Sequence, residues 1–299
     1  MKLLSSRQMK KRALPYLFLL PALILIIFGL GQAFANVLYY SLRNYNGNKP
    51  WADGFVGLNN FIKLFSDDPI FISSLGISIK WVVSQVLLQL VIGMVLALVL
   101  NQNFRGRGIA RTLVFMPWAI SGIITGVMWG LIYNEHIGVL NDVLKRLGFI
   151  QENIAWLGNI KTVFGAVVVA ELWRGIPFFA IMLLAGLQAI PADVYEAADI
   201  DGAGTFKKFF YVTLPFLKDT IILSTLLRAV WEFNNVDVIL NLTNGGPSRM
   251  TTTLSMYVVN QAIDASNFGY GSAAAVIGFI ILFCFATVYL KVSKFGREG

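Results

Sequence analysis

The sequence predicts an all-α membrane protein, a polytopic bundle of about six transmembrane helices. Of its 299 residues, 57% are hydrophobic and only 13% are charged, whereas soluble globular proteins are about 45–50% apolar and about 25% charged. The mean hydropathy is +0.68. In addition, six apolar segments are each long enough to cross about 30 Å of hydrocarbon, which takes about 20 helical residues.

The six segments are expected to be helices because backbone groups in lipid have no water to bind and must pair within the segment. We interpret residues 1–299 as a single transmembrane domain. Glu171, Arg174 and Pro177 interrupt the fourth segment, so the sequence supports this span least. The expected spans are about 14–40, 71–100, 112–133, 162–189, 219–240 and 270–290.

The first span resembles a secretory signal peptide in its layout. Three basic residues at 10–12 precede an apolar run, and Ala33-Phe34-Ala35 imitates a cleavage site. The apolar run is longer than a signal peptide requires and continues through Val37 to Tyr40. We therefore expect an uncleaved first span.

Basic residues predict the orientation of the spans. Fourteen Lys and Arg lie in the N-terminus, the 101–111 loop, the 190–218 segment and the C-terminal tail, and seven lie in the connections on the other side. Positive charge accumulates on the cytoplasmic side, so both termini and the 190–218 segment are expected in the cytoplasm. This distribution also accounts for the net charge of +8 without nucleic acid as a partner.

Several chemistries have little support in the sequence. Cys284 and His136 are the only residues of their kinds, so neither an internal disulfide, a histidine metal cluster nor a Ser-His-Asp triad is expected. No Gly-Lys dipeptide occurs, and the phosphate-binding loop of ATPases needs one. We therefore expect no catalytic residue, metal or cofactor in this chain.

The 190–218 segment is a charged, small-residue stretch between two apolar spans. Pro191 suits the start of a helix, and Gly202 and Gly204 suit its end and a sharp turn. Thr205 is positioned to cap a second short helix over 206–214. Its composition is compatible with docking to a protein and with lying on lipid.

The same stretch resembles the EAA loop of permease subunits in binding-protein-dependent ATP-binding-cassette importers, and nearly the whole chain is similar to their carbohydrate-uptake branch. The residues that carry the resemblance are Glu196-Ala197-Ala198, Asp201-Gly202-Ala203 and Pro215, the flanking Ala185–Pro191, Leu242–Pro247 and Thr251–Leu254, and the outer-loop motif Gly57–Phe61.

The resemblance implies a type I importer permease in a bacterial cytoplasmic (inner) membrane. Its partners would be a cytoplasmic ATPase dimer that binds ATP and Mg²⁺, a second homologous permease in a heterodimer, and an extracytoplasmic solute-binding protein. The substrate would be a carbohydrate, with an oligosaccharide favoured. The resemblance assigns the ATPase-coupling role to Glu196, Ala197, Ala198, Asp201 and Gly202.

Two pairs of opposite charges lie inside expected spans. Glu171 and Arg174 are three residues apart, and Arg228 and Glu232 are four apart, so each pair shares a helix face. A charge at mid-bilayer costs about 2.5–3.5 kcal/mol on insertion scales and usually faces a bundle interior or an aqueous cavity. These pairs therefore either stabilise packing or line a polar path.

The resemblance places a substrate path along the fourth and fifth spans. The two arginines leave an acidic substrate open, and the two glutamates leave a neutral one open. The candidate path residues are Glu171, Arg174, Gly175, Phe178, Arg228, Trp231, Glu232 and Asn235.

Two rival functions remain at this point. An ion-coupled secondary carrier for a polar solute would use the intramembrane carboxylates as ion ligands. A membrane enzyme would use Glu171 and Glu232 as acid and base.

Overall fold

The computed structural model describes Tyr16 and residues 18–295, so the start of the expected first span lies outside the described residues. The described chain is helical, and its only β feature is an isolated bridge between Arg43 and Phe55. It divides into two compact units, residues 1–67 with 258–277 and residues 68–257 with 278–299. Within the described residues, five helices are long and apolar enough to cross a membrane, and a bent pair of helices makes six if it counts as one span.

The first unit contains the apolar helix Phe18–Ser41, which includes η1 (Ile26–Gly31) and α2 (Gln32–Ser41). Asn60 of the Gly57–Phe61 motif is buried and donates to the carbonyls of Ser41 and Arg43, both at 2.9 Å. This motif therefore closes the carboxyl end of α2. The remaining elements are η2 (Pro50–Ala52), α3 (Asn59–Ser66), η5 (Asn260–Asp264) and the first part of α14 (Phe268–Ser293).

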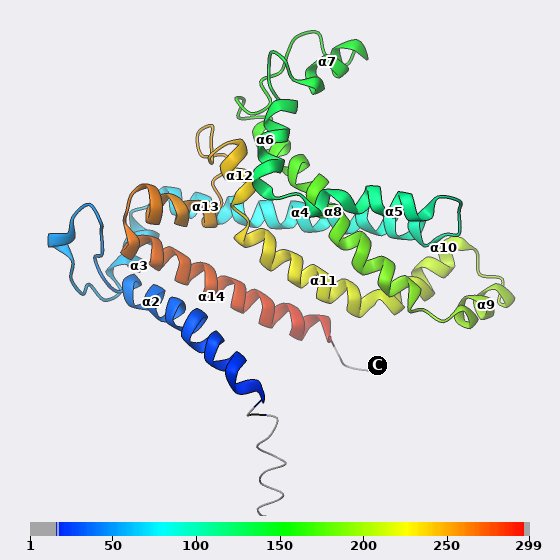
Figure 1. The fold of residues 1–299 in the computed structure, drawn as a ribbon, viewed down its shortest axis with the longest axis horizontal. Helices are drawn as coiled ribbons and strands as arrows, with labels where there is room; N and C mark the ends of the chain where they lie inside the picture. Colours follow the sequence, from blue (N-terminus) through cyan, green and yellow to red (C-terminus); the bar gives the residue numbers. More distant parts are fainter. Residues whose placement is uncertain (1–15, 17, 296–299) are drawn as a thin grey trace, which may run out of the picture. The chain divides into compact units, whose positions relative to one another are not determined.

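The second unit is built around three long helices, α4 (Pro69–Asn101), α8 (Val163–Gln188) and α11 (Leu214–Asn234) (Figure 1). The shorter elements are α5 (Arg107–Phe115), η3 (Met116–Ala119), α6 (Gly122–Ile132), α7 (Val139–Arg146), α9 (Ala192–Ile200), α10 (Thr205–Lys208), η4 (Phe209–Thr213) and α12 (Asp237–Leu242). α13 (Leu254–Val259) lies mostly in this unit, as does the last part of α14.

α4 starts where its sequence provides a cap. Asp68 accepts hydrogen bonds from the backbone N–H groups of Ile70 and Phe71 at 3.0 and 2.9 Å, and Pro69 occupies the first helical position. Both features stabilise a helix N-terminus, where backbone donors lack intrahelical partners.

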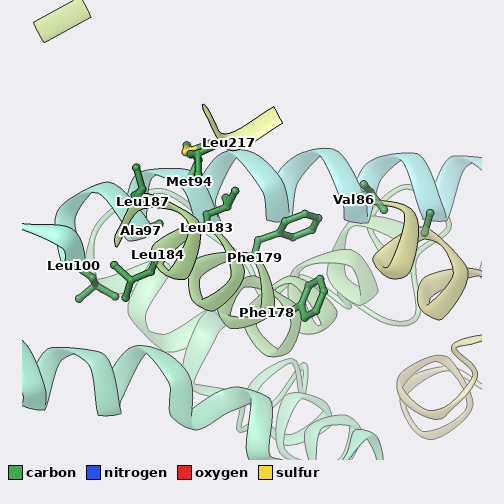
Figure 2. Packing of buried hydrophobic residues seen from close by; sticks show 11 residues of the cluster. Val86, Met94, Ala97, Leu100, Phe178, Phe179, Leu183, Leu184, Leu187 and Leu217 are labelled. Atoms are coloured by element: carbon green, nitrogen blue, oxygen red, sulfur yellow. The ribbon is translucent and has the colours of Figure 1, made fainter. Parts of the chain in front are cut away.

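α4 and α8 share the most extensive helix contact in the described chain, and their apolar side chains interdigitate (Figure 2). Gly93 permits the close approach, because a Cβ atom there would lie 2.6 Å from the Cβ of Phe179 and 3.1 Å from the backbone nitrogen of Ala180. Small residues serve this purpose in membranes, where packing rather than exclusion of water holds helices together.

The third span differs from the expected uninterrupted helix over 112–133. The apolar helices Arg107–Ala119 and Gly122–Ile132 are bent by 100° at a short break. Pro117 removes a backbone donor just before the break, and the Ser121 hydroxyl accepts from the Ile124 N–H at 3.3 Å as the new helix starts. A proline followed by an N-cap therefore breaks this span.

The fifth span also differs, since a helix was expected over 219–240 and a separate short helix over 206–214. One helical run instead extends from Thr205 to Asn234. A π-helical turn, Phe209–Thr213, precedes Pro215 and keeps the run continuous where proline would otherwise end it. The chain breaks at Asn235 and Val236, before α12.

We predict that Gly93→Ala destabilises the protein by about 1–3 kcal/mol, because the added methyl group overpacks the α4–α8 contact. Gly76→Ala is the matched control on the same helix, where a Cβ atom meets nothing within 4 Å. Thermal unfolding of the detergent-purified proteins measures the difference. Equal midpoints for the two variants would contradict the close contact.

Candidate functional site

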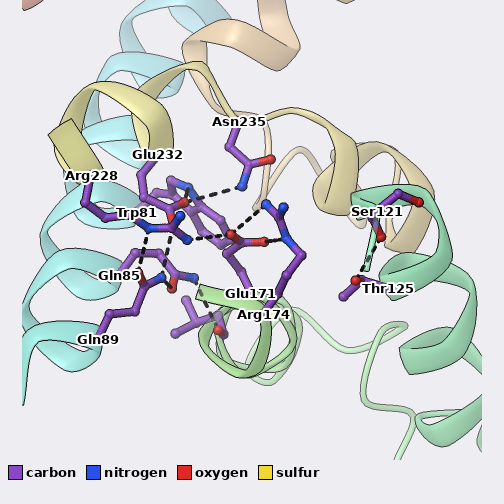
Figure 3. A network of polar contacts seen from close by, with 11 residues as sticks. Trp81, Gln85, Gln89, Ser121, Thr125, Glu171, Arg174, Arg228, Glu232 and Asn235 are labelled. Carbon is purple, nitrogen blue, oxygen red and sulfur yellow. Dashed lines mark hydrogen bonds and ion pairs between the residues drawn. The ribbon is translucent and has the colours of Figure 1, made fainter. Parts of the chain in front are cut away.

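Four charged side chains from two helices meet inside the second unit (Figure 3). The Arg228 terminal nitrogen Nη2 of α11 lies 2.9 Å from Glu171 Oε1 on α8 and 2.5 Å from Glu232 Oε1 on its own helix. Arg174 of α8 donates through Nε and Nη2 to the two oxygens of Glu171, at 3.0 and 2.8 Å. We call these four residues the charge cluster.

A third helix, α4, also contacts the charge cluster, and this contribution was not predicted from the sequence. Trp81 Nε1 donates to Glu232 Oε2 at 3.1 Å, and Gln89 Nε2 donates to Glu232 Oε1 at 3.0 Å. Gln89 also accepts from Arg228 Nε at 2.6 Å, and Gln85 accepts from Gln89 at 2.9 Å. The i, i+4, i+8 spacing of residues 81, 85 and 89 indicates a shared helix face. This spacing is the sequence feature from which their common location could have been predicted.

Burial explains why these contacts are so complete. The side chains of Glu171, Glu232 and Arg228 are only 0%, 1% and 5% exposed. Desolvated charges cost several kcal/mol each unless ion pairs and hydrogen bonds compensate them. Two guanidinium groups face two carboxylates, so the charge cluster is balanced.

The cluster borders a pocket of about 290 Å³ within the second unit. Trp231 and Trp118 are 47% and 48% exposed, so their rings are available at its edge. The lining residues are Trp118, Arg174, Arg228, Trp231, Glu232, Asn234 and Asn235. Five of the eight candidate path residues, namely Arg174, Arg228, Trp231, Glu232 and Asn235, thus share one pocket.

The other three candidates do not line this pocket but contact the residues that do. Glu171 anchors both arginines. Gly175 leaves room for Arg228 and Gln89, since both side chains would clash with a Cβ atom there. Phe178 is buried, with its ring centroid 5.1 Å from that of Trp231 and 5.9 Å from Arg228 Cζ.

Two helix breaks flank the pocket. Trp118 precedes the break before α6, while Asn234 ends α11 and Asn235 lies in the break before α12. α6 and α12 are packed closely, because a Cβ atom on Gly122 or Gly126 would lie 2.5 Å from that of Asp237 or Asn241. Irregular backbone at membrane depth is tolerated where it is buried in protein or lines a water-filled cavity.

The expected coupling segment forms α9 and a glycine turn at the other end of α8. Gly202 has φ +70°, and the N–H groups of Gly202 and Ala203 donate to the carbonyls of Asp199 and Ala198, which is a Schellman cap. Four of the five predicted coupling residues, Glu196, Ala197, Asp201 and Gly202, are exposed, and Ala198 is half-buried.

Side-chain contacts fasten α9 to the helical run that follows it. Lys208 of α10 forms an ion pair with Asp199. The Tyr195 hydroxyl lies 3.0 Å from the hydroxyl of Thr213. The exposed face of α9 is therefore tied to the helix that carries Arg228 and Glu232.

We predict that Arg228→Leu destabilises the protein by about 3–5 kcal/mol, because it leaves two buried carboxylates without their shared partner. Arg174→Leu is the matched control and should cost less, since Arg174 is 20% exposed and Glu171 keeps Arg228. Denaturant titration in detergent compares them. A greater loss in the control would contradict the central role of Arg228.

The chain has clear relatives among characterised transport proteins. Residues 89–293 match the family described as binding-protein-dependent transport system inner membrane component. The trehalose/maltose transport system permease of Thermococcus litoralis is 36% identical over 99% of both chains. The sulfoquinovosyl glycerol transport system permease of Agrobacterium fabrum is 36% identical over 95% of this chain and 91% of its own length.

Solved structures agree on the fold. A chain of a bacterial importer of the acidic polysaccharide alginate superposes with a TM-score of 0.81 at 20% identity, covering 98% of this chain and 99% of that chain. The same kind of transporter in complex with its alginate-bound periplasmic protein gives 0.83 at 20% identity, covering 96% of each chain. Taken with the match over residues 89–293, these relationships establish that the chain belongs to the binding-protein-dependent inner membrane components, the permeases of ATP-binding-cassette importers.

Proposed function

We propose that this permease passes a carbohydrate, an oligosaccharide in particular, through the pocket beside the charge cluster. Family membership favours an importer permease over an ion-coupled carrier and makes the chain a transport subunit rather than an enzyme. The named cargo of three relatives supports a glycan: trehalose or maltose, sulfoquinovosyl glycerol, and diacetylchitobiose for a permease of Streptomyces coelicolor that is 32% identical over 93% of this chain.

The observation that carries the proposal is the composition of the pocket. Trp118 and Trp231 offer half-exposed rings, and Asn234 and Asn235 offer amide groups at a helix break. Aromatic faces stack on the apolar faces of sugar rings, and amides both donate to and accept from hydroxyl groups. A pocket bordered by a companion permease would enclose a longer glycan than 290 Å³ holds.

Energy would enter through α9. In this proposal a cytoplasmic ATPase dimer binds ATP and Mg²⁺ and holds Glu196, Ala197, Ala198, Asp201 and Gly202 in a groove. Closure of the ATPase moves α9, and the Asp199–Lys208 and Tyr195–Thr213 contacts pass this movement to α11. Because α11 carries half of the charge cluster, the pocket then opens on the opposite side by rigid-body rotation.

The proposed assembly has four kinds of subunit. A second homologous permease completes the translocation path as a heterodimer, and an extracytoplasmic solute-binding protein delivers the glycan. The complex lies in a bacterial inner membrane with both termini of this chain in the cytoplasm, as the distribution of basic residues indicates.

Reconstituted uptake tests the proposal. The complete complex in proteoliposomes, with its binding protein outside and ATP inside, is expected to accumulate oligosaccharides from a panel of neutral and acidic glycans. Accumulation should require ATP and persist when an uncoupler removes ion gradients. A complex that takes up no glycan in the panel would overturn the carbohydrate assignment.

We predict that Glu196→Arg lowers ATP-driven uptake at least about tenfold while insertion and folding stay normal, because it places a repulsive charge on the proposed docking face. Glu152→Arg reverses an exposed acid far from α9 in sequence and is the matched control. Uptake and binding-protein-stimulated ATP hydrolysis are measured for both. Normal coupling in Glu196→Arg would sink the assignment of α9.

A further inference from the structure

We propose that the glycan carried by this permease is uncharged, and that Glu171 and Glu232 set this preference by neutralising the two arginines beside the pocket. The inference rests on the proposed function. It names the class of substrate that this same pocket accepts.

Arg174 is the arginine that reaches the pocket, with 20% of its side chain exposed. Glu171 holds it through two parallel hydrogen bonds of 3.0 and 2.8 Å. This bidentate geometry is the one that a substrate carboxylate would itself seek. An acidic sugar would therefore have to displace a buried protein carboxylate to use this guanidinium group.

Arg228 is still less available to a substrate than Arg174. Its Nη2 faces Glu171 and Glu232, and its Nε donates to Gln89 Oε1 at 2.6 Å. Because only 5% of its side chain is exposed, its charge interacts mainly with groups of the protein. Neither arginine of the cluster is left as a counter-ion for an anionic ligand.

Asp237 is a further charged group near the charge cluster. Asp237 in the first turn of α12 also attracts the Arg174 guanidinium group. It is exposed, and it follows the break at Asn235 and Val236. The net formal charge of these groups is negative by one, because Arg174 and Arg228 are opposed by three carboxylates, those of Glu171, Glu232 and Asp237. An anionic group on the substrate would therefore be repelled by the protein rather than attracted to it.

The pocket offers a substrate uncharged side chains. Its uncharged lining consists of Trp118, Trp231, Asn234 and Asn235, which provide stacking surfaces and amide groups. Hydroxyl groups satisfy such amides without bringing a charge into a desolvated site, where an unpaired charge is costly. The chemistry of the pocket thus fits a neutral oligosaccharide.

The experiment compares length-matched probes, maltotriose and trigalacturonate, together with other neutral and acidic trisaccharides that the binding protein accepts. ATP-dependent uptake by the wild-type complex in proteoliposomes should favour the neutral class by at least about tenfold, equivalent to about 1.4 kcal/mol. Preferential uptake of the acidic class would overturn the inference while leaving the carbohydrate assignment standing. Failure to take up either class would overturn both.

Matched variants test the role of the glutamates. Glu171→Gln keeps the side-chain size and frees Arg174, so the ratio of acidic to neutral uptake should rise at least about threefold. The double variant Glu171→Gln with Arg174→Gln restores the balance of charge and should return the ratio to the wild-type value. A ratio that does not change in a folded Glu171→Gln complex would contradict the role of Glu171. Where that single variant does not fold, the wild-type complex decides, because preferential uptake of the acidic class by it overturns the inference.

Discussion

The buried ion pairs of Glu171 and Glu232 with Arg228 are the interaction on which the second unit depends. A membrane interior offers little water to a bare charge, so each group must find its partners within the protein. This requirement brings α8 and α11 together and recruits Trp81 and Gln89 from α4. It also makes Gly175 necessary, because two of these side chains occupy the space that a Cβ atom would take.

The same constraint connects the two ends of the unit. α11 is continuous with α10 through the π-helical turn, so the run that ends at Asn234 beside the pocket begins at Thr205 beside α9. α9 is fastened to this run by an ion pair and a hydroxyl contact. Movement of α9 would thus act along one stiff element on the residues that hold the charge cluster in balance.

Sequence reasoning succeeded where a local rule governs the outcome. Hydropathy identified about six spans because length and polarity are properties of a segment. Helix periodicity placed Glu171 with Arg174 and Arg228 with Glu232 on shared faces, and each of these pairs forms an ion pair. It did not predict that Arg228 bridges to Glu171, nor that Gln89 joins them, because these contacts depend on how separate helices pack.

The membrane class, the helical character of the spans and the glycine turn at Gly202 can all be read from the sequence, since each follows from solvation or backbone sterics within a few residues. The packing of separate helices fixes which charges neutralise one another and which side chains remain at the pocket. Arg228 illustrates the difference: the sequence pairs it with Glu232 on its own helix, and packing against α8 and α4 adds Glu171 and Gln89 as partners. Long-range pairing depends on distances between helices, which no local pattern specifies.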